Sequence, residues 1–240
     1  MYKGKRILLI APAYNEQAKI GEVIRRVPLQ VVDKVLVVDD GSTDATAQVA
    51  RDAGANVLSL GSVKGVGFAI RAGFDLARSE GFDITVVIAG NNKDCPEEIP
   101  RLLDPLCDAN CDFVMGARYA RGGRHGGDMP LYRKIATRLH PMLIGLLCGR
   151  RITESTNGFR AIRTSLLSDP RINLDQRWLN GYELEVYLLI KALKLGFKYA
   201  EVPCTKIYPP KEIGQTKMRP FVDWWKMLRP IALLALGLKK

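Results

Sequence analysis

Short apolar runs alternate with amphipathic stretches over the first 117 residues of the chain. The runs at 6–11, 34–39, 56–60, 84–89 and 113–117 are mostly apolar, as expected for strands buried on both faces of a sheet. Between them, residues 18–27, 44–53, 65–79 and 97–107 repeat apolar positions at helical spacing. We expect Ser42 or Thr43 to cap the second of these helices. Repeated strand–helix units predict an α/β fold whose sheet is mainly parallel, with helices on both faces.

The pattern becomes less regular after residue 117. Residues 131–148 and 181–195 each predict a helix, and residues 199–203 predict a short strand. In the first of these helices, apolar side chains share one face, namely Leu131, Ile135, Leu139, Leu143 and Leu146.

The last twenty residues, 221–240, differ from both halves. Two adjacent tryptophans precede a short apolar run, and lysines and arginines flank it. Tryptophan beside basic residues suits a membrane interface, and the run is too short to span a bilayer. The alternative is a helix that packs on the domain or on a second copy of the chain.

Composition sets the broad class of protein. The chain has 240 residues and is 47% hydrophobic, which is enough for a full core. No run reaches the ~18 apolar residues that a spanning helix needs. The 5 cysteines lack Cys-x-x-Cys spacing, and the first strand begins almost at once. We expect reduced thiols in a cytosolic protein without a signal peptide.

Positive charge is concentrated in the second part of the chain. The formal net charge is +11, with −1 in residues 1–100 and +12 in residues 101–240. This asymmetry predicts an anionic partner, such as nucleic acid, a phosphorylated substrate or acidic lipid. The alternative is a merely soluble basic surface. Nucleic acid is disfavoured because no interleaved aromatic and basic residues or known binding module accompany the charge.

Polar segments follow the first two predicted strands. Ligands of parallel sheets bind at the carboxyl ends of strands, so these segments are candidates for a nucleotide site. In the first segment, which contains Pro12, we expect Tyr14 to lie against a ring and Asn15 and Glu16 to bond base or ribose edges. In the second, Asp39 and Asp40 are candidate acceptors for a base or ribose. At least one of this pair is expected to act only in the turn.

Taken together, the two segments resemble motifs of the family-two glycosyltransferases. Pro-x-Tyr-Asn-Glu is followed about 25 residues later by Val-Asp-Asp-Gly-Ser-x-Asp, and a segment with Lys64 and Gly65 is similar to the Gly-rich third motif of that family. Later segments continue the resemblance to the polyprenyl-phosphate (dolichol-phosphate) hexose synthase branch, at 96–100, 116–119, 156–160, 181–185 and 214–218.

The resemblance implies a GT-A-type nucleotide-sugar-binding fold. Residues 1–205 would form one catalytic domain, with 1–117 as its nucleotide-binding half and 118–205 as its acceptor half. Residues 206–240 would form a basic loop and a C-terminal interfacial segment.

The loop after the fourth strand departs from that branch, which ordinarily carries Asp-x-Asp there to hold Mg²⁺ or Mn²⁺ against the donor diphosphate. Aligned on Pro-Glu-Glu, the corresponding positions are Ala89 and Asn91, with Lys93 at the next polar position. Three outcomes remain open. Lys93 replaces the charge of the metal, Asp94 binds a displaced metal, or catalysis has been lost.

Other residues acquire expected roles through the same resemblance. Arg118, Arg133 and Thr137 would face the acceptor phosphate, and Glu183 and Glu185 would position sugar hydroxyls. Lys211 and Lys217 match a basic loop that covers the donor diphosphate, where cations stabilise the developing charge. The predicted catalytic set is therefore Asn91, Lys93, Asp94, Arg118, Lys211 and Lys217.

The implied function is an inverting glycosyltransferase that moves a sugar from a nucleotide sugar to a polyprenyl phosphate, for cell-envelope glycan biosynthesis. We expect no cofactor, or Mg²⁺ or Mn²⁺ if Asp94 is a ligand. The protein would act peripherally at the cytoplasmic face of the membrane, without nucleic acid and with homo-oligomerisation open. The alternatives are a non-catalytic nucleotide-sugar-binding protein and a glycosyltransferase with a non-lipid acceptor.

Overall fold

The fold is known from a computed structural model that describes residues 1–209 and 222–239. The strands are β1 (Ile7–Ala13), β2 (Lys34–Asp39), β3 (Asn56–Ser59), β4 (Ile84–Val87), β5 (Phe113–Ala117), β6 (Arg124–Gly127), β7 (Arg160–Arg163), β8 (Tyr199–Pro203) and β9 (Thr205–Tyr208). The helices are α1 (Ile20–Arg25), α2 (Thr46–Asp52), α3 (Val66–Ser79), α4 (Ile99–Asp108), α5 (Leu131–Cys148), α6 (Thr164–Leu167), α7 (Glu183–Lys194) and α8 (Val222–Ala235), with short 3₁₀ turns at Pro96–Glu98 and Arg177–Leu179.

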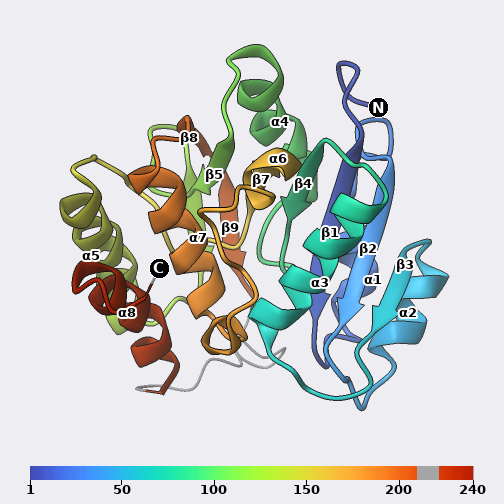
Figure 1. Cartoon of the computed structure of the whole chain (residues 1–240). Helices are drawn as coiled ribbons and strands as arrows, with labels where there is room; N and C mark the ends of the chain where they lie inside the picture. Colours follow the sequence, from blue (N-terminus) through green and yellow to red (C-terminus); the bar gives the residue numbers. More distant parts are fainter. Residues whose placement is uncertain (210–221, 240) are drawn as a thin grey trace.

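Seven strands form one sheet in the order β3-β2-β1-β4-β7-β5-β8. All neighbouring pairs are parallel except those of β7, which runs antiparallel between β4 and β5. Strands β6 and β9 pair separately as a two-stranded parallel ribbon. Figure 1 shows the sheet with α3 and α7 in front of it. The predicted α/β architecture with a mainly parallel sheet is confirmed.

Two hydrophobic cores explain why the strands are apolar on both faces. Successive residues of β1 point to opposite sides, so that Leu8 packs with α3 and α7 while Leu9 packs with α1 and α4. The neighbouring strands alternate in the same way, and all of β4 is buried. Parallel sheets are covered by helices in this manner because their crossover connections lie on the two faces.

Most predicted elements occur within a few residues of their expected bounds. The predicted cap of the second helix is wrong, because α2 begins at Thr46 and its preceding residue, Ala45, makes no side-chain cap. The Ser42 hydroxyl instead accepts a hydrogen bond from the backbone N–H of Asn15, at 2.9 Å. The residue that appeared suited to start a helix therefore joins two loops.

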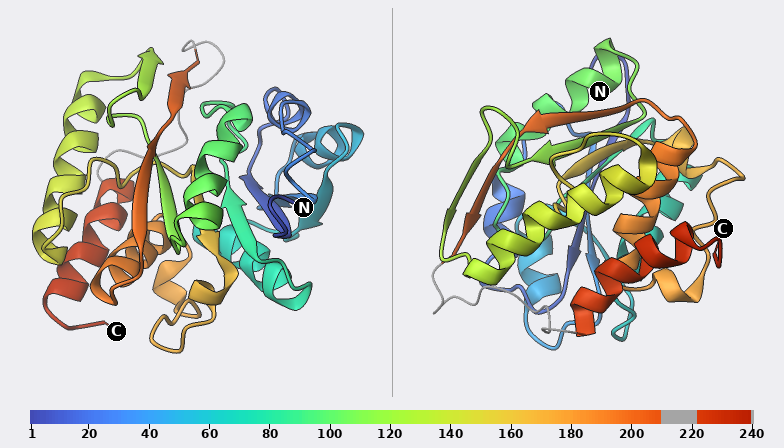
Figure 2. Two further views of the ribbon diagram at one scale, coloured as in Figure 1. Left: turned by 90° about the horizontal axis from the view of Figure 1, so that it is seen from above. Right: turned by 90° about the vertical axis from the view of Figure 1, so that its left-hand side faces the viewer.

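Helices α5 and α8 lie side by side at one end of the molecule (Figures 1 and 2). His140 of α5 fixes this packing, since its Nε2 lies 3.1 Å from the carbonyl oxygen of Met227 on α8. The shared apolar face of α5 points to solvent, with Leu131 72% and Leu146 84% exposed. Trp225 on α8 is also exposed. Within the described residues, no helix combines the length and hydrophobicity needed to cross a bilayer.

Candidate active site

The loops that follow β1 and β2 are joined by hydrogen bonds between backbone and side chains. The side-chain oxygen of Asn15 accepts from the backbone N–H of Thr43 at 2.8 Å, and Thr46 accepts from the backbone N–H of Glu16 at 2.7 Å. Asn15 has a φ of 49°, a left-handed conformation that asparagine tolerates better than most residues. The two predicted nucleotide motifs therefore form one rigid unit.

Asp40 connects this unit to the Gly-rich segment. Its carboxylate accepts from the backbone N–H groups of Lys64 at 2.6 Å and Gly65 at 2.9 Å. Burial raises the pKa of Asp40 despite these bonds. Gly65 has a φ of 106°, and a Cβ there would lie 2.3 Å from the carbonyl oxygen of Asn180. This position therefore requires glycine, because the start of α3 contacts the segment before α7.

A cavity of about 830 Å³ lies beside these loops. Its volume falls within the range of pockets that hold small molecules and cofactors. Of the predicted nucleotide residues, six line it, namely Pro12, Tyr14, Asn15, Glu16, Asp40 and Gly65. Asp39 and Lys64 do not line it, and Asp39 accepts a hydrogen bond from the backbone N–H of Ser42.

The loop after β4 enters the same cavity. Ala89, Asn91 and Lys93 all line it, and Lys93 is only 5% exposed. Two backbone hydrogen bonds anchor the loop, from Gly90 N–H to the Pro12 carbonyl and from Ile207 N–H to the Lys93 carbonyl. Ala89 and Asn91, the positions where the resemblance predicts Asp-x-Asp, therefore line the same cavity as the predicted nucleotide residues.

The ammonium group of Lys93 lies in an unusual electrostatic environment. Its Nζ lies over the ring of Tyr208, 5.1 Å from the centroid. Burial, followed by repulsion from Arg133 and Lys206, lowers the pKa of Lys93 to about 7. Perturbed lysines of this kind concentrate at functional sites, and an anionic ligand would favour the charged form.

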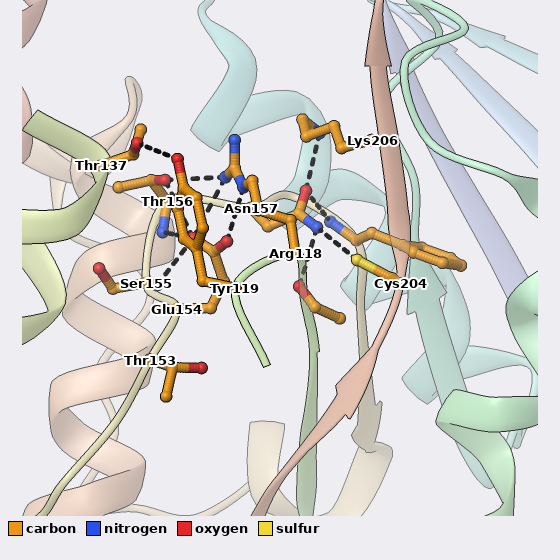
Figure 3. Close-up of polar contacts among 12 residues, drawn as sticks. Arg118, Tyr119, Thr137, Thr153, Glu154, Ser155, Thr156, Asn157, Cys204 and Lys206 are labelled. Atoms are coloured by element: carbon orange, nitrogen blue, oxygen red, sulfur yellow. Dashed lines mark hydrogen bonds and ion pairs between the residues drawn. The ribbon is translucent and has the colours of Figure 1, made fainter. Parts of the chain in front are cut away.

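Asp94 is not placed to contact a ligand in the cavity as Lys93 is. It is 2% exposed, and its two carboxylate oxygens accept from the Lys206 Nζ at 2.7 and 2.8 Å. Lys206 also donates to the Asn157 side chain at 2.7 Å, as Figure 3 shows. Asp94 does not line the cavity.

These residues do not fit a divalent metal. Ala89 has no donor atom, Asn91 offers only a neutral oxygen, and a metal at Asp94 would have to displace the lysine that holds it. Among residues 1–209 and 222–239, no group of three or more His, Cys, Asp or Glu side chains is placed to hold a metal.

Arg118 occupies a buried ion-pair network behind the cavity and does not line it. Its Nε and Nη2 donate to the Glu154 carboxylate at 2.7 and 3.1 Å, and Nη2 also donates to Thr156 at 2.9 Å (Figure 3). Its Nη1 donates to the Tyr208 hydroxyl at 3.1 Å. Burial alone would lower the pKa of Arg118, but Glu154 raises it overall. The expected contact with an acceptor phosphate remains a prediction, and this guanidinium already donates four hydrogen bonds to protein groups.

Of the two other expected acceptor residues, Arg133 lines the cavity and Thr137 does not. Arg133 lines the cavity, and its guanidinium carbon lies 5.6 Å from the centroid of the Tyr208 ring. Thr137 is buried, and its hydroxyl bonds the Tyr119 hydroxyl and the Arg133 carbonyl, each at 2.8 Å. Thr137 therefore bonds the backbone of Arg133 without lining the cavity itself.

Only one of the two predicted sugar-binding carboxylates lines the cavity. Glu185 lines the cavity and is paired with Arg160 at 2.9 Å, whereas Glu183 is buried outside it, 3.7 Å from Arg229 of α8. Burial raises the pKa of Glu183. Helix α8 also contributes a wall of the cavity, through Asp223, Lys226 and Met227. The C-terminal segment is therefore part of the site.

Two predicted residues, Lys211 and Lys217, lie outside the described residues. Sequence reasoning missed several others that build the site, namely Lys19, Glu154, Asn157, Arg160, Lys206 and Tyr208. Arg160 ended a recognised motif. Lys206 and Tyr208 gave no local signal, since Asp94, which binds Lys206, and Arg118, which binds Tyr208, are 112 and 90 residues away in the sequence.

Comparison with known proteins identifies the family of the chain. The profile of glycosyl transferase family 2 matches residues 8–169. The polyprenol monophosphomannose synthase of Mycolicibacterium smegmatis is 33% identical, over 89% of this chain and 81% of its own length. The undecaprenyl-phosphate mannosyltransferase of Micrococcus luteus is 32% identical, over 89% of this chain and 87% of its own.

Solved structures show the same fold. The glucosyl-3-phosphoglycerate synthase of Mycobacterium tuberculosis superposes with a TM-score of 0.69, covering 99% of this chain and 83% of that one at 24% identity. Another structure of that enzyme contains Mn²⁺, UDP-glucose and phosphoglyceric acid. From the extent of the profile match and the similarity to the two curated relatives, we conclude that the chain belongs to glycosyl transferase family 2.

Proposed function

We propose that this protein transfers a hexose from a nucleotide sugar to a polyprenyl phosphate, with inversion at the anomeric carbon. The proposal rests on one observation. Residues of the predicted nucleotide motifs line the same cavity as two cationic side chains, Lys93 and Arg133. The relatives named for polyprenyl-phosphate mannosyl transfer support the acceptor class. Glu185, which also lines the cavity, would hydrogen-bond the hydroxyls of the transferred sugar.

The chemistry requires little proton transfer. A phosphate acceptor is already an anion at neutral pH, so it attacks the anomeric carbon without a strong general base. Catalysis then depends on holding donor and acceptor in line and on stabilising the nucleoside diphosphate as it leaves. Neither His140, which is bonded to Ser155 and Met227, nor Asp94 is required as a base in this scheme.

We further propose that Lys93 supplies the positive charge that a metal supplies elsewhere in the family. Lysine binds phosphates as a point charge, and Lys93 stands two residues after the position of the second missing carboxylate. Lys211 and Lys217 would add charge, as predicted from the sequence. In the alternative with a displaced metal, Asp94 would have to leave Lys206.

The exposed apolar faces of α5 and α8 would bring the cavity to a membrane. Their apolar side chains include Leu139 and Trp225, with Arg138 and Lys226 close by in sequence, which suits an anionic surface. Such a surface would be needed because a lipid-linked acceptor is held in the membrane. The protein would act peripherally at the cytoplasmic face. Flotation with anionic vesicles should fall for a Leu139→Ser, Trp225→Ser variant, and unchanged flotation would contradict this part.

A transfer assay tests the function. Purified protein is incubated with UDP- and GDP-hexoses and either a short polyprenyl phosphate or the matching unphosphorylated polyprenol. The proposal predicts a glycolipid product only with the phosphate. Lys93→Ala should lower the rate about a hundredfold, whereas Lys191→Ala, at a half-buried lysine on α7, should not.

The same assay, repeated with soluble phosphorylated and hydroxyl acceptors, decides between the alternatives. Nucleoside diphosphate binding without transfer to any phosphate acceptor would favour a non-catalytic binding protein, for which the lost carboxylate pair is the motivating observation. Transfer only to a soluble acceptor would favour a non-lipid substrate. Either result would overturn the proposal.

A further inference from the structure

The ring of Tyr208 lies close to both Lys93 and Arg133, the cations expected to bind the donor and the acceptor phosphate, respectively. Tyr208 is the last residue of β9, is 3% exposed and lines the cavity. The Lys93 Nζ lies 5.1 Å, and the Arg133 guanidinium carbon 5.6 Å, from the centroid of its ring. Lys93 comes from the loop after β4 and Arg133 from α5, so one ring connects distant parts of the chain.

The tyrosine is itself firmly held. Its hydroxyl accepts from Arg118, which Glu154 binds through two hydrogen bonds. Its backbone lies against Gly127 of β6, where a Cβ would come within 2.0 Å of the Tyr208 carbonyl oxygen. The neighbouring residue, Ile207, donates its N–H to the Lys93 carbonyl at 2.8 Å. Ring, hydroxyl and backbone are therefore fixed by separate contacts.

The arrangement answers an electrostatic problem. Arg133 and Lys93 repel one another, and this repulsion contributes to the low pKa of Lys93. The face of an aromatic ring carries negative potential and attracts both cations. One rigid ring can therefore hold two like charges close together in the absence of substrate, and it also sets the spacing between them.

We propose that Tyr208 is a positioning residue that fixes the donor-phosphate cation Lys93 and the acceptor-phosphate cation Arg133 relative to each other. This inference rests on the proposed function and adds to it a residue for alignment. In-line displacement depends on the relative placement of attacking and leaving groups, and small misplacements cost large factors in rate. The buried Arg118–Glu154 pair thus acts on the reaction through Tyr208.

Graded weakening of the ring provides the test. Phenylalanine and its mono-, di- and trifluorinated forms are incorporated at position 208, because fluorine reduces the negative potential of the face while nearly preserving the shape. We measure kcat, the KM values of nucleotide sugar and polyprenyl phosphate, and the Kd of the nucleoside diphosphate. The matched control places the same series at Tyr199, which lies outside the cavity lining and hydrogen-bonds Glu201.

The expected result is a stepwise fall in kcat/KM for both substrates along the series at position 208, reaching about tenfold, and a flat series at position 199. The Kd of the nucleoside diphosphate should rise in parallel through Lys93. Tyr208→Phe alone should lower kcat/KM less than the trifluorinated form does. This difference distinguishes the contribution of the ring from that of the hydroxyl.

A flat series at position 208 in an active enzyme would overturn the inference and leave the proposed function standing. Absence of transfer by the unsubstituted protein would instead overturn the proposed function. In that case the diphosphate Kd series still reports whether the ring positions Lys93, and a flat Kd series would refute that as well.

Discussion

At the ends of β1 and β2, backbone N–H groups hold the polar side chains, whereas beside β5 and β9 the charged side chains hold one another. Asp40 accepts from the backbone of Lys64 and Gly65, and Asn15 accepts from that of Thr43. On the other side, Arg118 is bound by Glu154 and Lys206 by Asp94. We refer to these two regions as the backbone-held side and the ion-paired side.

The difference matters because the two means of support fail differently. A lost hydrogen bond to a backbone group costs on the order of 1 kcal/mol, and water can often replace it. A buried ion pair that loses one partner leaves a charge in a poorly solvating interior. The ion-paired side should therefore be the more sensitive to single substitutions.

The largest effect is expected from breaking the buried pair of the ion-paired side. Glu154→Ala leaves the guanidinium of Arg118 buried without its carboxylate, which should lower the free energy of unfolding by about 3–5 kcal/mol. Urea denaturation measures this loss. The double variant Glu154→Ala, Arg118→Met should recover part of it, and an unfolding free energy equal to that of the unsubstituted protein in the single variant would contradict the contrast.

Lys93 gives the next prediction, with the opposite sign. Its folded pKa, about 7, lies below the ordinary 10.5, so protonation is unfavourable in the fold. Stability should therefore be greatest above pH 10.5 and should decrease as pH falls towards 7. Lys93→Met should remove this dependence and raise stability at pH 7 by about 1–3 kcal/mol. Denaturation at pH 7 and pH 9 measures both, and a destabilised Lys93→Met protein would count against the assignment.

His140 predicts a smaller, acid-dependent effect at the packing of α8. Burial lowers its pKa from the ordinary 6.5, so its neutral ring contributes stability above pH 6.5. That contribution is lost as pH falls through 6.5 towards the folded pKa. Thermal unfolding at pH 5 and 7 should show a reduced difference for His140→Gln and an unchanged one for the exposed His125→Gln. Equal behaviour of the two variants would refute the prediction.

The smallest effect is expected on the backbone-held side. Ser42→Ala removes the acceptor of the Asn15 backbone N–H and should cost about 1 kcal/mol, with a rise in the KM of the nucleotide sugar larger than any fall in kcat. Ser168→Ala, at an exposed serine whose hydroxyl donates to the Thr164 carbonyl, is the control. A loss as large as that of Glu154→Ala would remove the distinction between the two sides.

The same contrast explains what could be predicted from the sequence. Strands such as β1 and β4 were identified because burial on both faces leaves an unbroken apolar run, and the polar residues that follow them mark a site at the strand ends. Glu16 and Asp40 line the cavity for that reason. On the backbone-held side, local pattern and topology together predicted these strand ends, although the helix cap expected at Ser42 or Thr43 was wrong.

The ion-paired side escaped prediction because its partners are far apart in the chain. Asp94 and Lys206 are 112 residues apart, and no local pattern indicates that a lysine on β9 fixes the loop after β4. Arg118 was predicted as a site residue, but the sequence could not show that its guanidinium is paired with the carboxylate of Glu154. β7 was missed because its four residues contain two arginines, which break the apolar pattern expected of a buried strand.

The central claim is that a lysine performs the work of a metal at the donor diphosphate, and the transfer rate in chelator tests it most directly. The reaction is followed with nucleotide sugar and polyprenyl phosphate in excess EDTA, then again with Mn²⁺ or Mg²⁺ added back, for the unsubstituted protein and for Lys93→Ala. If Lys93 replaces the metal, EDTA should leave the rate unchanged and Lys93→Ala should lower it sharply. A rate that EDTA abolishes, that divalent metal restores and that Lys93→Ala leaves unchanged would contradict the claim.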